Sequence, residues 1–130
     1  MPVGFYGIGA QKAGTTWLSA MLRQHPQVWI PDIKEVHYFT REVAAGRGDD
    51  WYEAQFAAGA GKTTGDITPA YATLEMPAID HAHRIAPNAK LLFCVRHPVE
   101  RVWSNIVMHG AKTGRHNSQE EWLRLARGGW

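Results

Sequence analysis

The chain has 130 residues, a length that suits about one folded domain built around a single core. Its composition, 45% hydrophobic and 20% charged, excludes disordered, collagen-like and coiled-coil chains. The single cysteine, Cys94, excludes a disulfide framework and a multi-cysteine zinc site. A net charge of +2 is too small to predict nucleic-acid binding. No apolar run approaches the roughly 20 residues that span a bilayer, and no signal peptide is apparent, so we expect a cytoplasmic protein.

Strands and helices are predicted to alternate along the chain. Strands are expected at residues 3–9, 28–30 and 90–96, and the first and last of these are continuous apolar runs typical of buried strands. Helices are expected at residues 15–24, 50–56 and 76–85, from Pro98 onward, and at 118–127. Residues 33–39 are expected to be extended or a turn, and the small residues of 43–48 and 57–65 to form loops or helix ends. This alternation predicts an α/β fold with a parallel sheet, in which ligands bind beyond the carboxyl ends of the strands.

The first strand is followed by a glycine-bounded loop, Gly-Ala-Gln-Lys-Ala-Gly-Thr-Thr at residues 9–16. The N–H groups at the start of the following helix favour an anion, and Lys12 adds a positive charge. A dinucleotide fingerprint is excluded because Lys12 occupies the position of its third glycine. A nucleoside triphosphate loop needs a lysine where Thr15 stands. The segment therefore predicts a phosphate loop whose lysine is displaced.

The segment after the last predicted strand carries a second set of anion-binding groups. Residues 96–104 read Arg-His-Pro-Val-Glu-Arg-Val-Trp-Ser. Arg96 ends the strand, and Ser104 lies on the polar side of the helix that follows. A guanidinium binds phosphate with a fork of donors, and this spacing can bring Arg96 and Ser104 to one anion.

Residues 34–39, Lys-Glu-Val-His-Tyr-Phe, contain candidates for a general base. If the segment is extended, Glu35 and His37 point to one side and Lys34 to the other. A carboxylate and an imidazole on one face can both accept a proton from a reacting group.

These segments resemble the motifs of sulfotransferases that use 3′-phosphoadenylyl sulfate as the sulfuryl donor. Residues 8–18, Ile-Gly-Ala-Gln-Lys-Ala-Gly-Thr-Thr-Trp-Leu, resemble the family's 5′-phosphosulfate loop, and residues 96–104 look like its 3′-phosphate motif. Residues 34–39 are similar to the Lys-Glu-x-His-Phe-Phe stretch of carbohydrate (heparan-type) sulfotransferases, and residues 65–71 to a Ser/Thr-Pro-x-Tyr segment near the active site. The resemblance covers residues 3 to about 109. It implies a three-layer parallel sheet with the topology of P-loop nucleoside triphosphatases.

The resemblance also implies roles for individual residues. Lys12 would stabilise the departing phosphate, and Glu35, with His37 in support, would deprotonate a hydroxyl or amine acceptor, with residues 34–39 favouring a carbohydrate. The implied contacts to the donor and to its product, adenosine 3′,5′-bisphosphate, are Gly14, Thr15 and Thr16 at the 5′-phosphate and Arg96 and Ser104 at the 3′-phosphate. The tryptophan that matches Trp17 lies against the donor's adenine, whereas the apolar helix face would place Trp17 in the core, and both readings stay open. The resemblance implies a reaction that needs no metal.

Two other functions remain open on the sequence. A P-loop kinase or nucleoside triphosphatase is disfavoured by the displaced Lys12 and because no strand ending in aspartate is apparent. The second alternative is a non-catalytic module, the remnant of a donor site, that binds adenosine bisphosphate without transferring a sulfuryl group. Because a sulfotransferase domain is considerably longer than 130 residues, we expect the chain to be the N-terminal portion of one such domain, with the C-terminal part absent and the donor site open.

Overall fold

A computed structural model describes residues 3–113, and the helix predicted at 118–127 lies outside that range. The described elements, in chain order, are β1 (Phe5–Gly9), α1 (Thr15–Arg23), β2 (Val28–Trp29), the π-helical turn η1 (Tyr38–Glu42), α2 (Asp49–Ala54), the 3-10 turn η2 (Ala57–Gly59), β3 (Thr63–Ile67), the 3-10 turn η3 (Pro69–Thr73), α3 (Met76–Ile85), β4 (Lys90–Phe93) and α4 (Pro98–Thr113). The predicted alternation of strands and helices is confirmed, although most of the predicted element boundaries differ from the observed ones by a few residues.

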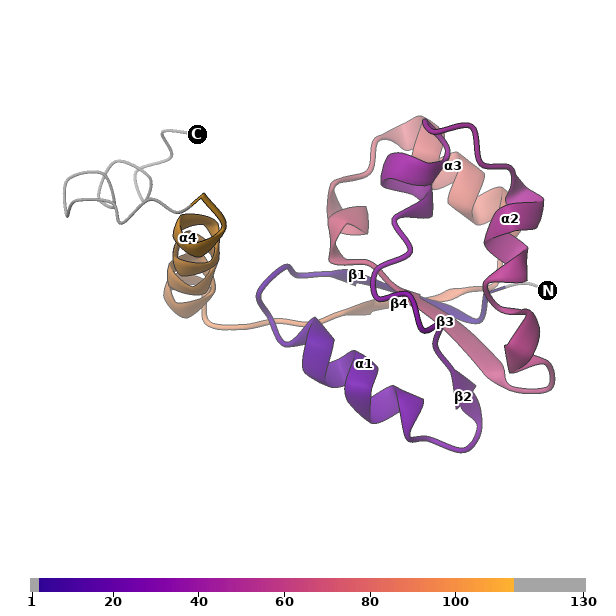
Figure 1. The fold of residues 1–130 in the computed structure, drawn as a ribbon, viewed down its shortest axis with the longest axis horizontal. Coiled ribbons are helices and arrows are strands. Elements are labelled where there is room, and N and C mark those ends of the chain that lie inside the picture. The colour runs from indigo at the N-terminus through magenta and orange to yellow at the C-terminus, as the bar shows by residue number, and fades with distance from the viewer. Residues whose placement is uncertain (1–2, 114–130) are drawn as a thin grey trace.

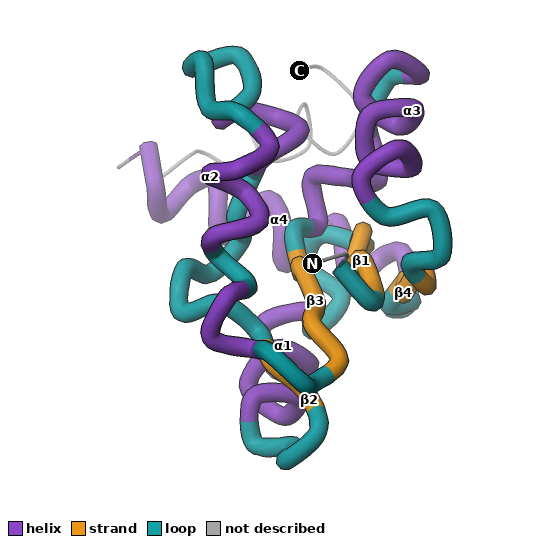
Figure 2. Tube along the Cα trace, turned by 90° about the vertical axis from the view of Figure 1, so that its right-hand side faces the viewer, coloured by secondary structure: helices purple, strands orange, loops and turns teal. Residues whose placement is uncertain are grey.

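The four strands form one parallel sheet in the order β2-β3-β1-β4. Helix α1 lies on one face of the sheet, and α2 and α3 lie on the other (Figures 1 and 2). These are the layers that parallel strands joined by helical crossovers produce. The predicted α/β class and the parallel sheet are therefore confirmed.

Strand β1 contributes to a core on each face of the sheet, because successive side chains of a strand point to opposite sides. Phe5 packs with Ile30 and Ile67 on the face that α1 covers. The neighbouring Tyr6 belongs to a larger aromatic cluster under α2 and α3, with Tyr38, Phe39, Tyr52, Phe56 and Tyr71. The buried pattern predicted for the first strand is confirmed.

Strand β3 was missed by the sequence prediction, which expected a loop through residue 65. Its sequence, Thr-Thr-Gly-Asp-Ile, contains glycine and aspartate, two residues that are depleted in strands. Gly65 is required by packing, because a Cβ there would lie 2.0 Å from Cζ of Phe5. Strand β3 carries Asp66 as its penultimate residue beside β1, and it ends in Ile67.

Strand β4 lies at the edge of the described sheet, so the expectation that it is buried is wrong. Leu91 is 67% exposed and Phe93 is 53% exposed. After β4 the chain runs out to α4, which stands apart from the sheet (Figure 1).

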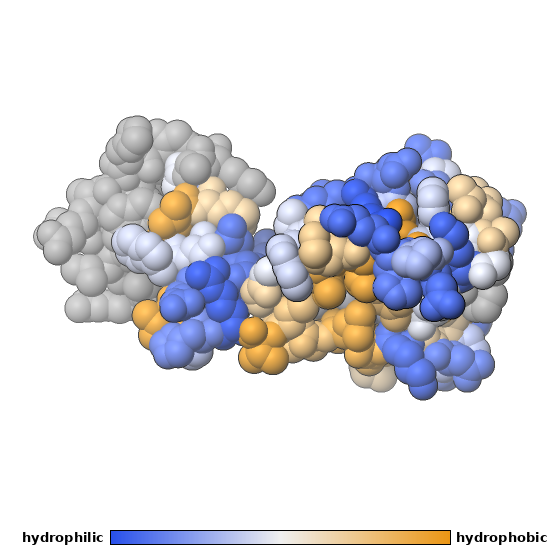
Figure 3. All heavy atoms as spheres, turned by 90° about the horizontal axis from the view of Figure 1, so that it is seen from below, coloured by the Kyte–Doolittle hydropathy of each residue, from blue (hydrophilic) through white to orange (hydrophobic). Residues whose placement is uncertain are grey.

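Hydrophobic residues form patches on the molecular face seen from below (Figure 3). Within residues 3–113, no helix has the length and apolar character needed to cross a bilayer.

Candidate functional site

A cavity of about 520 Å³ opens at the carboxyl end of β1. It gathers all the predicted site residues except Trp17 and His37: Lys12, Gly14, Thr15, Thr16, Glu35, Arg96 and Ser104. Gln11, Lys34, Pro69 and Met108 complete its lining. Segments far apart in the sequence therefore converge on one space.

The loop between β1 and α1 has the backbone geometry of an anion site. Gly14 adopts a left-handed conformation, with φ of 89°, and starts α1 without a side-chain cap. The N–H groups of the first helical turn lack partners within the helix, and the helix dipole adds positive potential where the cavity lies. Thr15 is 7% exposed, whereas Thr16 is exposed. Lys12, at φ of 64°, supplies the ammonium group.

Arg96 joins the two predicted phosphate motifs. Its Nη1 donates to the carbonyl oxygen of Lys12 at 3.3 Å, although 84 residues separate them. Its Nε donates to Oε2 of Glu100 at 3.2 Å, one helical turn further on. These bonds hold the guanidinium beside the loop, and α4 brings Ser104 to the same cavity. Arg96 and Ser104 thus line the same cavity as Lys12.

Glu35 and His37 lie together, but not in the extended segment from which their proximity was predicted. Both have positive φ, 59° and 56°, so the alternation argument is wrong for this segment. Nε2 of His37 lies 3.2 Å from Oε2 of Glu35, and its Nδ1 lies 3.0 Å from Oγ1 of Thr40. Nζ of Lys34 lies 3.6 Å from Oε1 of Glu35. Glu35 lines the cavity, and the imidazole of His37 contacts its carboxylate without lining the cavity.

Trp17 is 67% exposed, so the reading that places it in the core is wrong. Helix α1 packs on the sheet through Leu18 and Leu22, which turns Trp17 away from the core. It does not line the cavity that contains Lys12. Contact with a donor's adenine stays a prediction for this residue.

Asp66 is a buried charged residue that the sequence reasoning missed. Its side chain is fully buried and accepts hydrogen bonds from Oγ1 of Thr68 at 2.7 Å, the Tyr71 hydroxyl at 2.8 Å and the Tyr52 hydroxyl at 2.9 Å. Burial raises the pKa of its carboxyl above the ordinary value, and the three donors act against that shift. The available signal was the aspartate itself, followed by Thr68 and Tyr71 within five residues.

The raised pKa of Asp66 predicts how stability depends on pH. Between the pKa of the unfolded chain, about 4, and the higher folded pKa, the folded protein binds more protons, so its unfolding free energy falls as the pH rises. We expect wild type to lose stability relative to Asp66→Asn as the pH rises through this interval, measured by urea denaturation at several pH values. Asp80→Asn, at an exposed position of α3, is the control and should follow wild type. A difference between wild type and Asp66→Asn that does not vary with pH would contradict the prediction.

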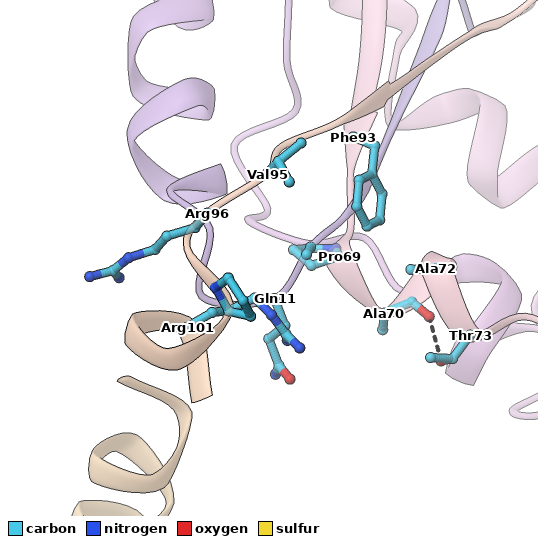
Figure 4. A pocket seen from close by; sticks show the side chains of 11 residues that line it. Gln11, Pro69, Ala70, Ala72, Thr73, Phe93, Val95, Arg96 and Arg101 are labelled. Carbon is cyan, nitrogen blue, oxygen red and sulfur yellow. Dashed lines mark hydrogen bonds between the residues drawn. The ribbon is translucent and has the colours of Figure 1, made fainter. Parts of the chain in front are cut away.

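A second cavity, of about 660 Å³, lies beside the first and shares Gln11, Pro69 and Arg96 with it. Figure 4 shows Phe93 and the alanines of η3 on one side of it, and Arg96 directed away from them. Its lining contains no carboxylate and no imidazole, so it offers no general base. Of these two cavities, the one lined by Glu35 offers a carboxylate that could accept a proton.

The known proteins that resemble this chain in sequence or fold are sulfotransferases. The sequence profile of the family described as "Sulfotransferase domain" matches residues 8–126. The membrane-associated sulfotransferase kil1 of Dictyostelium discoideum is 36% identical over 101 residues, which cover 75% of this chain and 21% of kil1. The heparan sulfate glucosamine 3-O-sulfotransferase 6 of Homo sapiens is 36% identical over 108 residues, which cover 82% of this chain and 30% of that protein.

The fold also matches a solved structure, a sulfotransferase from Alicyclobacillus acidocaldarius. The TM-score is 0.73 at 27% sequence identity, and the match covers 96% of this chain and 59% of the other. The chain thus spans less than a third of the two curated relatives named above and about three fifths of this solved structure.

Proposed function

This chain belongs to the sulfotransferase domain family, and from that premise we propose that it transfers a sulfuryl group from 3′-phosphoadenylyl sulfate to an acceptor hydroxyl or amine. The observation that carries the proposal is the single cavity that collects Lys12, Thr15, Glu35, Arg96 and Ser104. A phosphate loop, a second phosphate-binding pair and a general base are the parts that such a transfer needs, and they face one space.

In this proposal the donor's two phosphates occupy two parts of the cavity. The N–H groups at the start of α1, with Thr15 and Thr16, hold the 5′-phosphate by charge-assisted hydrogen bonds. Arg96 and Ser104 hold the 3′-phosphate, which the guanidinium can grip with two parallel donors. Trp17, exposed on α1, is available to the adenine. The bond from Arg96 to the carbonyl of Lys12 keeps the two phosphate sites in register.

The chemical step is an in-line displacement at sulfur. Glu35 takes the proton of the acceptor hydroxyl or amine, and the acceptor oxygen or nitrogen forms a bond to sulfur as the bond between sulfur and the phosphate oxygen breaks. Negative charge moves onto that phosphate oxygen, where the ammonium of Lys12 and the loop N–H groups stabilise it. His37, 3.2 Å from Glu35, stabilises the carboxylate in its proton-accepting form. The products are the sulfated acceptor and adenosine 3′,5′-bisphosphate.

A saccharide is the acceptor class we propose first. The relatives matched include heparan sulfate glucosamine 3-O-sulfotransferases, and the segment with Glu35 and His37 is the one that resembles carbohydrate enzymes. The acceptor hydroxyl would approach Glu35, which is 30% exposed and therefore reachable from solvent. Heparan sulfate belongs at the head of an acceptor panel.

A nucleoside triphosphatase is the less favoured function, although β3 does carry an aspartate beside β1. The carboxylate of Asp66 is fully buried, holds three hydroxyl groups and is not part of the cavity lining. It is therefore unavailable to a nucleotide's magnesium ion. The displacement of Lys12 from the lysine position of a nucleoside triphosphate loop also disfavours this function.

The proposed donor site predicts a preference for the 3′-phosphate. We expect adenosine 3′,5′-bisphosphate to raise the melting temperature more than adenosine 5′-phosphate or ATP does. Arg96→Ala should weaken binding of the bisphosphate about 10- to 100-fold, the usual cost of losing a charged hydrogen bond, and should remove the preference over the 5′-phosphate. Isothermal titration calorimetry measures both effects.

Arg84→Ala, at an exposed position of α3 outside the cavity, is the matched control and should bind the bisphosphate as wild type does. Equal binding of ATP and the bisphosphate, or unchanged binding by Arg96→Ala, would contradict the proposed donor site. Binding of the bisphosphate without transfer to any acceptor in the panel would instead indicate a non-catalytic binding module.

A further inference from the structure

We infer that Asp66 is a positioning residue: through the hydroxyls of Thr68 and Tyr71 it holds the backbone of His37 and Tyr38, and so fixes where Glu35 and His37 point. The inference rests on the proposed role of Glu35 as the base. It assigns a purpose to a buried carboxylate that does not line the cavity and for which the sequence predicted no role.

Two relays of hydrogen bonds connect the carboxylate of Asp66 to residues 35–38, which we call the catalytic segment. The N–H of Tyr38 donates to the Tyr71 hydroxyl at 2.9 Å, and that hydroxyl donates to Oδ2 of Asp66 at 2.8 Å. The N–H of His37 donates to Oγ1 of Thr68 at 3.4 Å, and that hydroxyl donates to Oδ1 of Asp66 at 2.7 Å. Because an N–H can only donate, each hydroxyl accepts from the backbone and must give its own proton to Asp66.

The segment held in this way is one that would not keep its shape alone. Glu35 and His37 both occupy the left-handed region, which side chains with a Cβ rarely adopt and which persists where the surroundings impose it. The N–H groups of His37 and Tyr38 also stand at the start of η1, where a helical turn offers them no internal partner. The two hydroxyls satisfy these donors and, in doing so, fix the backbone next to the proposed base.

Tyr52 provides a matched control for this inference. Its hydroxyl also donates to Oδ2 of Asp66, at 2.9 Å, and both tyrosines are buried. The Tyr52 hydroxyl contacts the carboxylate of Asp66, and the Tyr71 hydroxyl in addition receives the N–H of Tyr38. Tyr52→Phe and Tyr71→Phe therefore remove the same chemical group from the same carboxylate, and only the second releases the catalytic segment.

The test compares these two variants by amide hydrogen exchange and by kinetics. We expect the amide of Tyr38 to exchange at least about tenfold faster in Tyr71→Phe than in Tyr52→Phe, because its hydrogen bond is lost in the first variant alone. Both variants should lose a similar amount of thermal stability. In Tyr71→Phe, kcat for sulfuryl transfer should fall about 10- to 100-fold with little change in donor KM, since misplacement of the base impairs the chemical step.

The Thr68 relay is tested by conservative rescue. Thr68→Val removes the hydroxyl and should speed exchange at His37, whereas Thr68→Ser keeps the hydroxyl and should restore slow exchange and most of kcat. Equal exchange and equal kcat in Tyr52→Phe and Tyr71→Phe would overturn the inference, because Asp66 would then be only a buried structural group. Exchange is measured without any donor or acceptor, so a failure of the proposed enzymatic function, seen as full activity in Glu35→Gln, is a separate result.

Discussion

Replacing Lys12 with alanine should lower the rate of sulfuryl transfer by about 10²- to 10³-fold, the usual cost of removing one preorganised group that stabilises developing charge. Lys12 lines the cavity on the loop that ends at the left-handed Gly14, where α1 begins. The chemical step depends on that charge more than donor binding does, so kcat should fall further than donor affinity. Initial rates with a saccharide panel, and calorimetric titration with adenosine 3′,5′-bisphosphate, separate the two effects.

Lys62→Ala is the control for this substitution. Lys62 is an exposed lysine in a Gly-Lys-Thr sequence just before β3 and is not part of the cavity lining. Its removal should leave the transfer rate within about twofold of wild type, as is usual for surface changes. Full activity in Lys12→Ala would show that the cavity at the end of β1 is not the site of transfer.

Glu35→Gln should reduce kcat by about 10²- to 10⁴-fold, the range expected when a general base is lost. The amide keeps the size of the side chain and can still contact His37, so the segment and the donor site should remain in place. Affinity for adenosine 3′,5′-bisphosphate should therefore stay close to that of wild type. The measurement is the acceptor-dependent rate at saturating donor.

Two further variants show which of the paired groups takes the proton. Glu42→Gln is the control for these variants: Glu42 lies at the end of η1 and pairs with Arg47 at 3.8 Å, so this variant should retain activity. His37→Ala should retain part of the activity, because His37 acts through Glu35 at 3.2 Å. A large loss in His37→Ala together with retained activity in Glu35→Gln would assign the base to the imidazole instead.

The sequence was sufficient to predict the parts of the molecule whose signals are local. The glycines and Lys12 between an apolar strand and a helix predict a phosphate loop, and the structure has a loop with a left-handed Gly14 between β1 and α1. Arg96 was equally predictable as a candidate ligand-binding residue, because ligands bind beyond the carboxyl ends of parallel strands. The α/β class followed from the alternation of elements alone.

What the sequence could not supply depends on contacts between distant segments. β3 breaks the rules of strand composition at Gly65, and only the ring of Phe5 above it explains why. The geometry of Glu35 and His37 depends on hydroxyls some thirty residues away, at Thr68 and Tyr71. The exposure of β4 and of Trp17 follows from which faces the other helices cover, which no local pattern records.

The strand order β2-β3-β1-β4 has a consequence for how freely the site can vary. From β1 the chain crosses to the outer strand β2 and returns to β3, which pairs with β1. It then crosses β1 to place β4 on the opposite side, so the topological switch point lies between β1 and β4. The loops after these two strands diverge there and leave a crevice that owes its existence to connectivity. The wall made by Arg96 and Ser104 lies outside both cores, so it can change at a smaller cost in stability than the wall at Glu35, whose neighbours Val36 and Tyr38 belong to the larger core.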